Sequence, residues 1–413
     1  GLGCAPVAEV LGRLRSAEGY LAFALNRNDR LRASSGVALQ LLKAGSLAWC
    51  RAVVPAITEA QLRRDEERAL QLLQTLLATE PEVNARTEYL DQLVITLASV
   101  MLQVPFSWLQ AITKRLEVST AQAQATEPTV RRFLHSGRAG MCVWRQAGPW
   151  TLVREAERAV ALHEMAGDRR ASRHVRAMIA GWGWLDLGDQ PGVQQRLSEL
   201  ETEMATTEDW WAQAHWRLLS SLTLSQSDDE SDWLKAERTL EPMQQRSKGL
   251  AIYALYAEWG LASVRCRQER WLQAEEHASR VMAVLGRLPV LACCVTALLL
   301  TAMRRQGKVA EAGALARSGL ERLPILGGLG VHEVGFRLAA SEALHAAQDS
   351  EAARAQLKEA LNQIQVRAHE IDDPRWRRSY LANNPGVRQT LKTADAWGVE
   401  VPIMTENGHA PTD

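Results

Sequence analysis

The chain has 413 residues, of which 46% are apolar and 23% are charged, which is the composition of a globular protein. Its 48 basic and 48 acidic side chains give a formal net charge of zero, so no global field would attract nucleic acid or an anionic membrane. Leu, Ala, Arg, Glu and Gln dominate every segment and β-branched alternation is nearly absent, so we predict an all-α protein.

From the N-terminus onward, the chain repeats one helical phrase. The tetrapeptides 108–111, 233–236 and 271–274 each place an alanine three positions after a tryptophan, near the start of a predicted helix. A small residue there allows two helices joined by a short turn to cross closely. Extending this register predicts nine anchor positions at intervals of 36 to 43 residues, namely Ala33, Ala69, Ala111, Val153, Val193, Ala236, Ala274, Ala312 and Ala353.

Turn residues precede the later anchors, as at 187–190, 306–308 and 348–350. Each interval therefore predicts one antiparallel helix hairpin, and the pattern resembles the tetratricopeptide (TPR) repeat with a longer, about 40-residue period. A hairpin of this kind cannot bury its apolar face alone, so neighbouring repeats stack. We therefore expect an all-α, right-handed superhelical solenoid ending in a C-terminal capping helix.

The predicted organisation follows the same register. We expect weaker N-terminal repeats over 1–150, TPR-like repeats over 151–372, C-terminal capping helices over 373–400 and a flexible tail over 401–413. The longest apolar run, Leu288–Met303, is shorter than the roughly 20 residues that a bilayer needs, so we predict a buried helix and no membrane partner. Six cysteines without a C-x-x-C pair are typical of a reducing compartment, which indicates a cytoplasmic protein.

Motifs for catalysis are lacking in this sequence. It contains no kinase glycine-rich loop, no H-R-D or D-F-G phrase and no phosphate-binding G-x-x-x-x-G-K-[ST] loop. His332 and Glu333 begin like a zinc-binding H-E-x-x-H motif, but Phe336 stands where the second histidine is needed. We therefore predict a chain that is not an enzyme and has no cofactor and no metal.

The 14 tryptophans are the strongest candidates for a binding surface. The TPR likeness implies that the first helix of each hairpin faces an inner, concave surface. Counting back from the turns predicts a groove with an aromatic floor and basic edges, suited to a peptide with acidic groups. Its residues would be Met178, Trp182, Asp186, Tyr256, Trp259, Arg267, Arg304 and Arg305. The alternative is that these tryptophans only pack neighbouring repeats.

The end of the chain carries a more specific phrase. Residues 372–397, with the segments 165–189 and 337–360, resemble the C-terminal TPR array of large multidomain bacterial Ser/Thr protein kinases that also carry a signalling-type NTPase domain. The positions that match the family's ending are Asp373, Pro374, Arg377, Tyr380, Leu381, Pro385, Arg388, Thr390, Leu391 and Trp397. Asn384 stands where the family has an apolar residue.

This resemblance implies a non-catalytic protein-interaction and regulatory module. Its partner would be a peptide or protein on the concave face, or the kinase and NTPase portions of the parent protein. A second hypothesis is a ligand-sensing helical-repeat domain of a signalling NTPase, as in transcription activators or defence proteins, which recognises a small molecule or a foreign protein. An enclosed pocket would distinguish this second hypothesis from an open groove.

Overall fold

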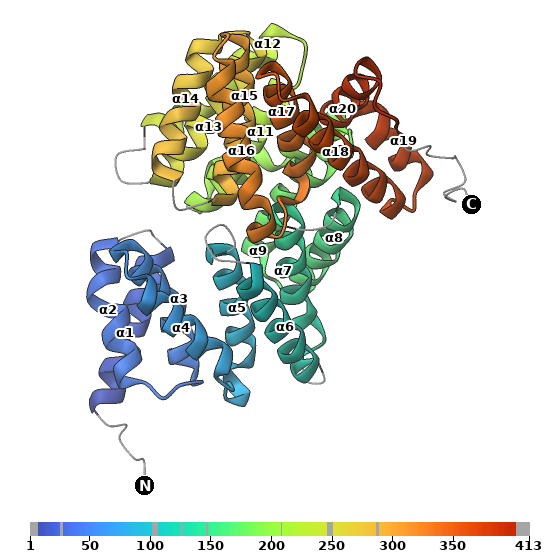
Figure 1. Ribbon diagram of the computed structural model, residues 1–413. Coiled ribbons are helices and arrows are strands. Elements are labelled where there is room, and N and C mark those ends of the chain that lie inside the picture. The colour runs from blue at the N-terminus through green and yellow to red at the C-terminus, as the bar shows by residue number, and fades with distance from the viewer. Residues whose placement is uncertain are drawn as a thin grey trace. The chain divides into compact units, whose positions relative to one another are not determined.

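The computed structural model describes residues 7–24, 28–100, 106–124, 127–145, 148–207, 209–245, 251–285 and 289–401. Within these ranges the secondary structure consists of helices α1 to α20 and short helical segments η1 to η4, with no strand. Consecutive helices pack against one another as hairpins, which confirms the predicted all-α architecture (Figure 1). No helix in the described ranges is long and apolar enough to cross a membrane. Residues 402–413 of the predicted tail lie outside them.

The chain divides into two compact units, Gly1–Gly137 and Arg138–Asp413, so the division falls inside α7. The first unit is made of α1 (Val7–Ala24), α2 (Asn28–Leu41), α3 (Leu47–Arg63), α4 (Glu66–Ala78), η1 (Val83–Ala85), α5 (Arg86–Val100), α6 (Phe106–Ala123), η2 (Pro128–Val130) and the first half of α7 (Arg131–Trp144).

The repeat register is wrong at Ala111 in this first unit. Ala111 is exposed, and α6 instead buries Leu109, Ile112 and Leu116. Because residues 109, 112 and 116 recur at helical spacing, they form the apolar face of α6, and the small residue lies outside that face. The tetrapeptide at 108–111 therefore resembles the later copies in sequence but not in packing.

The second unit continues from α7 with α8 (Pro149–Met165), α9 (Arg169–Met178), η3 (Ile179–Trp184), α10 (Gln190–Thr206), α11 (Trp210–Ser225), α12 (Glu230–Gln245), α13 (Ala251–Arg267), α14 (Trp271–Leu285), α15 (Pro289–Arg305), α16 (Val309–Leu326), η4 (Gly330–His332), α17 (Glu333–Ala346), α18 (Ser350–Glu370), α19 (Pro374–Asn383) and α20 (Pro385–Ala396). Here the register is correct. The six anchors from Val153 to Ala353 are at most 1% exposed.

Local signals place the hairpin turns of the second unit where the sequence predicted them. Gly188, Gly307 and Gln348 have left-handed backbone angles that reverse the chain after a helix. Asp189 and Asp349 then cap the helices that follow, because their carboxylates accept the otherwise unbonded backbone N–H groups of Gly192 and Ala352. The first helices of successive hairpins, α11, α13, α15 and α17, pack side by side, and α20 joins the end of this row against α17.

The C-terminal helices cover the last hairpin. Asp373 caps α19 and Asn384 caps α20, with Pro374 and Pro385 in the first turns that follow. Leu391 and Trp397 pack on a buried cluster that contains Leu338, Leu357 and Leu361. The C-terminal phrase that the sequence singled out therefore builds a helix pair that shields the apolar end of the array.

The same C-terminal segment also returns to the start of the second unit. Arg154 on α8 forms an ion pair with Asp372 at 2.9 Å, and the ring of Trp184 lies 4.7 Å from that of Trp376. Asn384 donates hydrogen bonds of 2.6 Å to both the backbone and the side-chain oxygen of Asp186. The second unit therefore closes on itself, since residues about 200 positions apart are in contact.

Candidate functional site

The aromatic residues of the predicted groove lie together but are covered. Trp182 on η3 stacks on Trp259 of α13 at 5.9 Å, and the rings of Trp144 and His332 lie 5.7 and 4.7 Å from Trp182. Trp182 is 7% exposed and Trp259 is 5% exposed. These tryptophans form a core between the end of α7, η3, α13 and η4, which favours the packing alternative for both rings.

Tyr256 extends this core along α13. Its hydroxyl lies 3.0 Å from Nε2 of His215, and the ring of His215 lies 5.2 Å from that of His174. Burial lowers the pKa of His174 to about 4 and that of His332 to about 3, so both imidazoles are neutral at physiological pH. The aromatic residues that the sequence placed on the floor of a groove are thus packed with histidine rings.

Glycine allows η3 to approach its neighbours closely enough to carry Trp182 into the core. A Cβ at Gly181 would come within 3.0 Å of Leu219 on α11, and one at Gly183 would come equally close to Val153 on α8. η3 is a π-helical segment, a local widening that occurs frequently at functional sites. Trp182, within this segment, packs on Trp259 of α13.

The remaining predicted groove residues are distributed over several elements. Met178 is half-buried at the end of α9. Asp186 accepts hydrogen bonds from Asn384, and burial raises the pKa of its carboxyl to about 6. Arg267 pairs with Asp228 at 2.8 Å, Arg304 pairs with Glu342 at 2.6 Å, and the guanidinium of Arg305 lies over the ring of Trp271.

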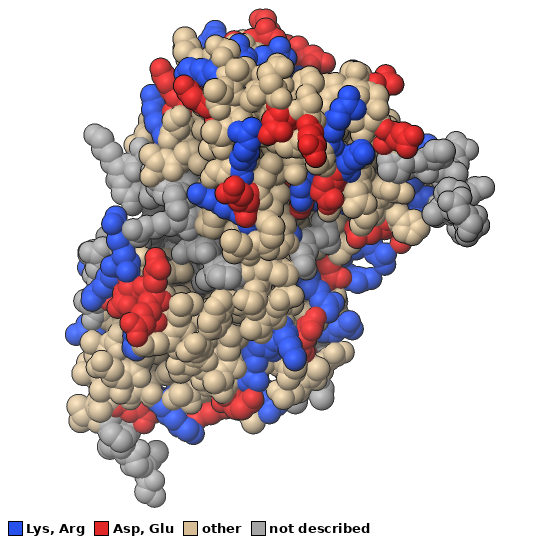
Figure 2. Space-filling view, viewed as in Figure 1, with Lys and Arg blue, Asp and Glu red and all other residues tan. Residues whose placement is uncertain are grey.

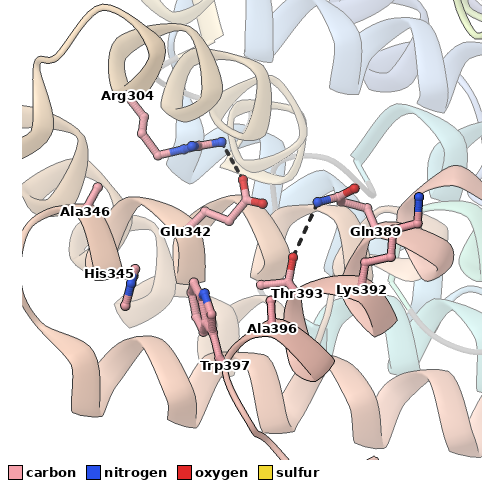
Figure 3. A pocket seen from close by; sticks show the side chains of 9 residues that line it. All are labelled: Arg304, Glu342, His345, Ala346, Gln389, Lys392, Thr393, Ala396 and Trp397. Atoms are coloured by element: carbon pink, nitrogen blue, oxygen red, sulfur yellow. Dashed lines mark hydrogen bonds and ion pairs between the residues drawn. The ribbon is translucent and has the colours of Figure 1, made fainter.

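One of these arginines, Arg304, borders an accessible pocket of about 440 Å³ (Figure 3). The pocket lies where α15, α17 and α20 meet, at the end of the row of first helices. Helix α17 contributes Glu342, His345 and Ala346, and α20 contributes the opposite wall. The residues of that wall are Gln389, Lys392, Thr393, Ala396 and Trp397.

The pocket combines a flat apolar surface with charge. His345 stacks on Trp397 with ring centroids 4.3 Å apart and an interplanar angle of 30°. Figure 3 shows these two rings on one side, with Lys392 on the other side and the Arg304–Glu342 ion pair between α15 and α17. Glu342 offsets the charge of Arg304, whereas Lys392 is exposed and forms no ion pair with the described residues. The pocket therefore contains an aromatic platform and, elsewhere in its lining, one positive charge that is available to a ligand.

Sequence reasoning missed most of this pocket. The sequence predicts only capping helices over 373–400, although α20 has a second face. That face carries Gln389, Thr393 and Ala396 at helical spacing, next to Lys392. It lies opposite to the buried residues Val387 and Ala394. This periodicity could have indicated a partly polar surface, but only the packing of α20 on α17 brings His345 and Arg304 to it.

The described residues contain no group of three His, Cys, Asp or Glu side chains placed to hold a metal ion. On the face seen in Figure 2, basic and acidic side chains are interspersed, without a continuous surface of one sign. Neither protein-family models nor curated proteins match the sequence. Among solved structures the chain is similar to the crystal structure of the yeast Tom70, with a TM-score of 0.35 and 11% identity over 94% of this chain and 96% of that one.

Proposed function

We propose that this chain is a non-catalytic protein-interaction module whose pocket between α15, α17 and α20 binds a peptide segment of a partner protein. The observation that carries this proposal is the His345–Trp397 stack in an accessible pocket that exposed Lys392 also lines. Aromatic side chains are common anchors of protein–protein interfaces. Of the groove residues predicted from the sequence, Arg304 belongs to this pocket, and the role of the others in binding stays a prediction.

The chemistry of the pocket defines the segment that fits it. An apolar or aromatic side chain would pack on the ring of Trp397, and a neighbouring carboxylate would meet the ammonium group of Lys392. A second carboxylate would meet Arg304 only by competing with Glu342, which already accepts from its guanidinium at 2.6 Å. We therefore propose a ligand with one apolar anchor followed by one acidic residue.

We further propose that the module regulates a larger signalling protein with Ser/Thr kinase and NTPase portions, in the cytoplasm. The support for this parentage is the likeness of the C-terminal phrase, residues 372–397, to the ending of that family. A regulatory effect would require the ligand to bind two states of the parent with different affinities. Exposed Lys392 and His345 at the pocket rim favour peptide binding over the enclosed small-molecule site of the alternative hypothesis.

A random peptide library displayed on phage and selected against the purified chain tests the proposal. We expect enriched peptides that share an apolar residue next to an acidic one. Their affinity should fall about tenfold or more in the double variant His345→Ala with Lys392→Glu, because the platform and its cation are both lost. Lys358→Glu on the exposed face of α18 is the matched control and should bind like the wild type. A library without enriched peptides, or equal affinities in all three proteins, would refute the proposal.

A further inference from the structure

The second unit contains another accessible pocket, of about 660 Å³, between α9 and the end of α10. Three of its lining residues, Arg169, Arg173 and Arg176, follow one another at i, i+4 and i+7 along α9. This spacing places three guanidinium groups on one face of the helix, with neighbouring Cβ atoms about 5–6 Å apart. The proposed peptide pocket shares no residue with this one, so the two can be tested separately.

The carboxylates in this pocket leave part of the hydrogen-bonding capacity of the arginines unused. Glu203 on α10 lies 3.4 Å from Nε of Arg173 and 3.6 Å from Nη1 of Arg176, longer than the roughly 2.7–2.9 Å of a charge-assisted hydrogen bond. Nε of Arg173 is buried and donates no hydrogen bond to the described residues. Arg169 has no partner among them. These guanidinium groups therefore retain N–H donors that an acceptor entering the pocket can use.

The polar groups around the arginines leave donors free for an anion. Nη1 of Arg173 donates to Oγ1 of Thr207 at 2.6 Å, and the backbone N–H of Asp209 donates to the same oxygen. Because both bonds use Thr207 as an acceptor, its own hydroxyl hydrogen remains available. Asp168 caps the backbone at the start of α9 by accepting from Ala171, so recognition would depend on side chains and not on the helix N-terminus.

The charges of the pocket favour a dianion over a single carboxylate. Three arginines face two glutamates among the described lining residues, and one of these, Glu164, accepts from the hydroxyl of Ser172. The carboxylate of Glu203 reaches two guanidinium groups and aligns well with neither. A tetrahedral phosphoryl group has three oxygens and up to two negative charges, so it can bridge adjacent guanidinium groups by bidentate bonds.

We propose that the pocket between α9 and α10 binds a phosphoryl group, held by Arg169, Arg173 and Arg176 with the hydroxyl of Thr207. The bound group displaces Glu203 from the two arginines that it approaches. The volume of the pocket leaves room for the molecule that carries the phosphoryl group, since ligand pockets commonly measure about 300–1,000 Å³. This inference does not rest on the peptide pocket.

Isothermal titration with pyrophosphate, inorganic phosphate and a synthetic phosphoserine peptide tests the site, with the unphosphorylated peptide as a control ligand. We expect saturable binding of at least one phosphorylated probe. The double variant Arg169→Gln with Arg176→Gln should weaken it about fivefold or more, since each arginine supplies one partly exposed ion pair. Arg354→Gln, an exposed arginine on α18 without a described partner, should leave the affinity unchanged.

Glu203→Gln gives a test in the opposite direction. It removes the carboxylate that competes with the ligand, so the affinity for the same probe should rise several-fold. Binding of the peptide alone would identify a phosphorylated protein as the source of the group, and binding of pyrophosphate would identify a small molecule. Absence of binding by every phosphorylated probe, or equal affinities in the wild type, the double variant and Glu203→Gln, would overturn the site. If the double variant failed to fold by circular dichroism, Arg169→Gln alone would provide the loss-of-binding test.

Discussion

Replacing Gly330 by alanine tests whether the glycine-rich connection before α17 is a tertiary contact or a loose loop. Gly330 has a left-handed φ of 54°, and a Cβ there would come within 3.0 Å of the backbone carbonyl oxygens of Cys142 and Val143 in α7. Arg367, a buried arginine, donates a hydrogen bond to the carbonyl of Gly330. The substitution therefore disturbs backbone on both sides of the contact.

The expected cost has two parts. An alanine in the left-handed region costs about 1–2 kcal/mol, and forcing apart two backbone segments in a close-packed region costs roughly another 1–3 kcal/mol. Gly307 is the matched control, because it has a left-handed φ of 79° but no atom within 4 Å of the position of an added Cβ. Gly307→Ala should therefore cost only the first part.

Urea unfolding followed by tryptophan fluorescence measures both variants, since Trp144 follows Val143 directly and lies in the aromatic core. We expect the free energy of unfolding to fall by about 2–5 kcal/mol for Gly330→Ala and by about 1–2 kcal/mol for Gly307→Ala. Equal losses in the two variants would show that the approach of Gly330 to α7 does not contribute to stability.

Three further changes report on the closure and the core of the second unit. Asn384→Ala removes the cap of α20 and both hydrogen bonds to Asp186, so it should lower the free energy of unfolding by about 2–3 kcal/mol. The control Asn383→Ala, at an exposed position, should change it by less than about 0.5 kcal/mol. Similar losses for the two variants in urea titrations would contradict the closure of the second unit. The folded pKa of Asp186, about 6, exceeds the usual 3.8, so its contribution to stability is complete below pH 3.8 and is lost as pH rises toward 6. The urea midpoint of Asp186→Asn should therefore rise relative to that of the wild type as pH increases over this window. A difference between the two midpoints that stays constant with pH would refute the raised pKa. His332 has a folded pKa of about 3 and titrates near 6.5 when unfolded, so stability should fall as pH drops below 6.5. His332→Phe should reduce this fall in the thermal unfolding temperature. An unchanged dependence of that temperature on pH would exclude His332 as the cause.

The register of the repeats shows which structural features a local sequence pattern predicts. The anchors from Val153 to Ala353 are buried, because a turn followed by a small residue directs two adjacent helices to cross at that point. At Ala111 the same phrase misleads, since the apolar spacing around Leu109 places a different face of α6 in the core. Sequence similarity between repeats therefore predicts helices and turns more securely than it predicts the buried side of each helix.

The burial of the predicted groove tryptophans has a related reason. Trp182 and Trp259 lie together, with ring centroids 5.9 Å apart, but both are buried. Trp144 and His332 cover these two rings, although they are separated by almost 190 residues in the sequence. No local periodicity predicts that such distant segments meet.

The sequence by itself determined the helices, their caps and their turns, because hydrogen bonds within a few residues and apolar spacing along one helix decide these features. Asp373, Pro374 and Pro385 act locally in this way at the C-terminal phrase. Only the tertiary structure decided which faces remain accessible, since exposure depends on what the rest of the chain packs against. Burial of Trp182 and access to Trp397 both follow from such long-range packing, where α7 and η4 cover the first ring and α20 leaves the second at the edge of a pocket.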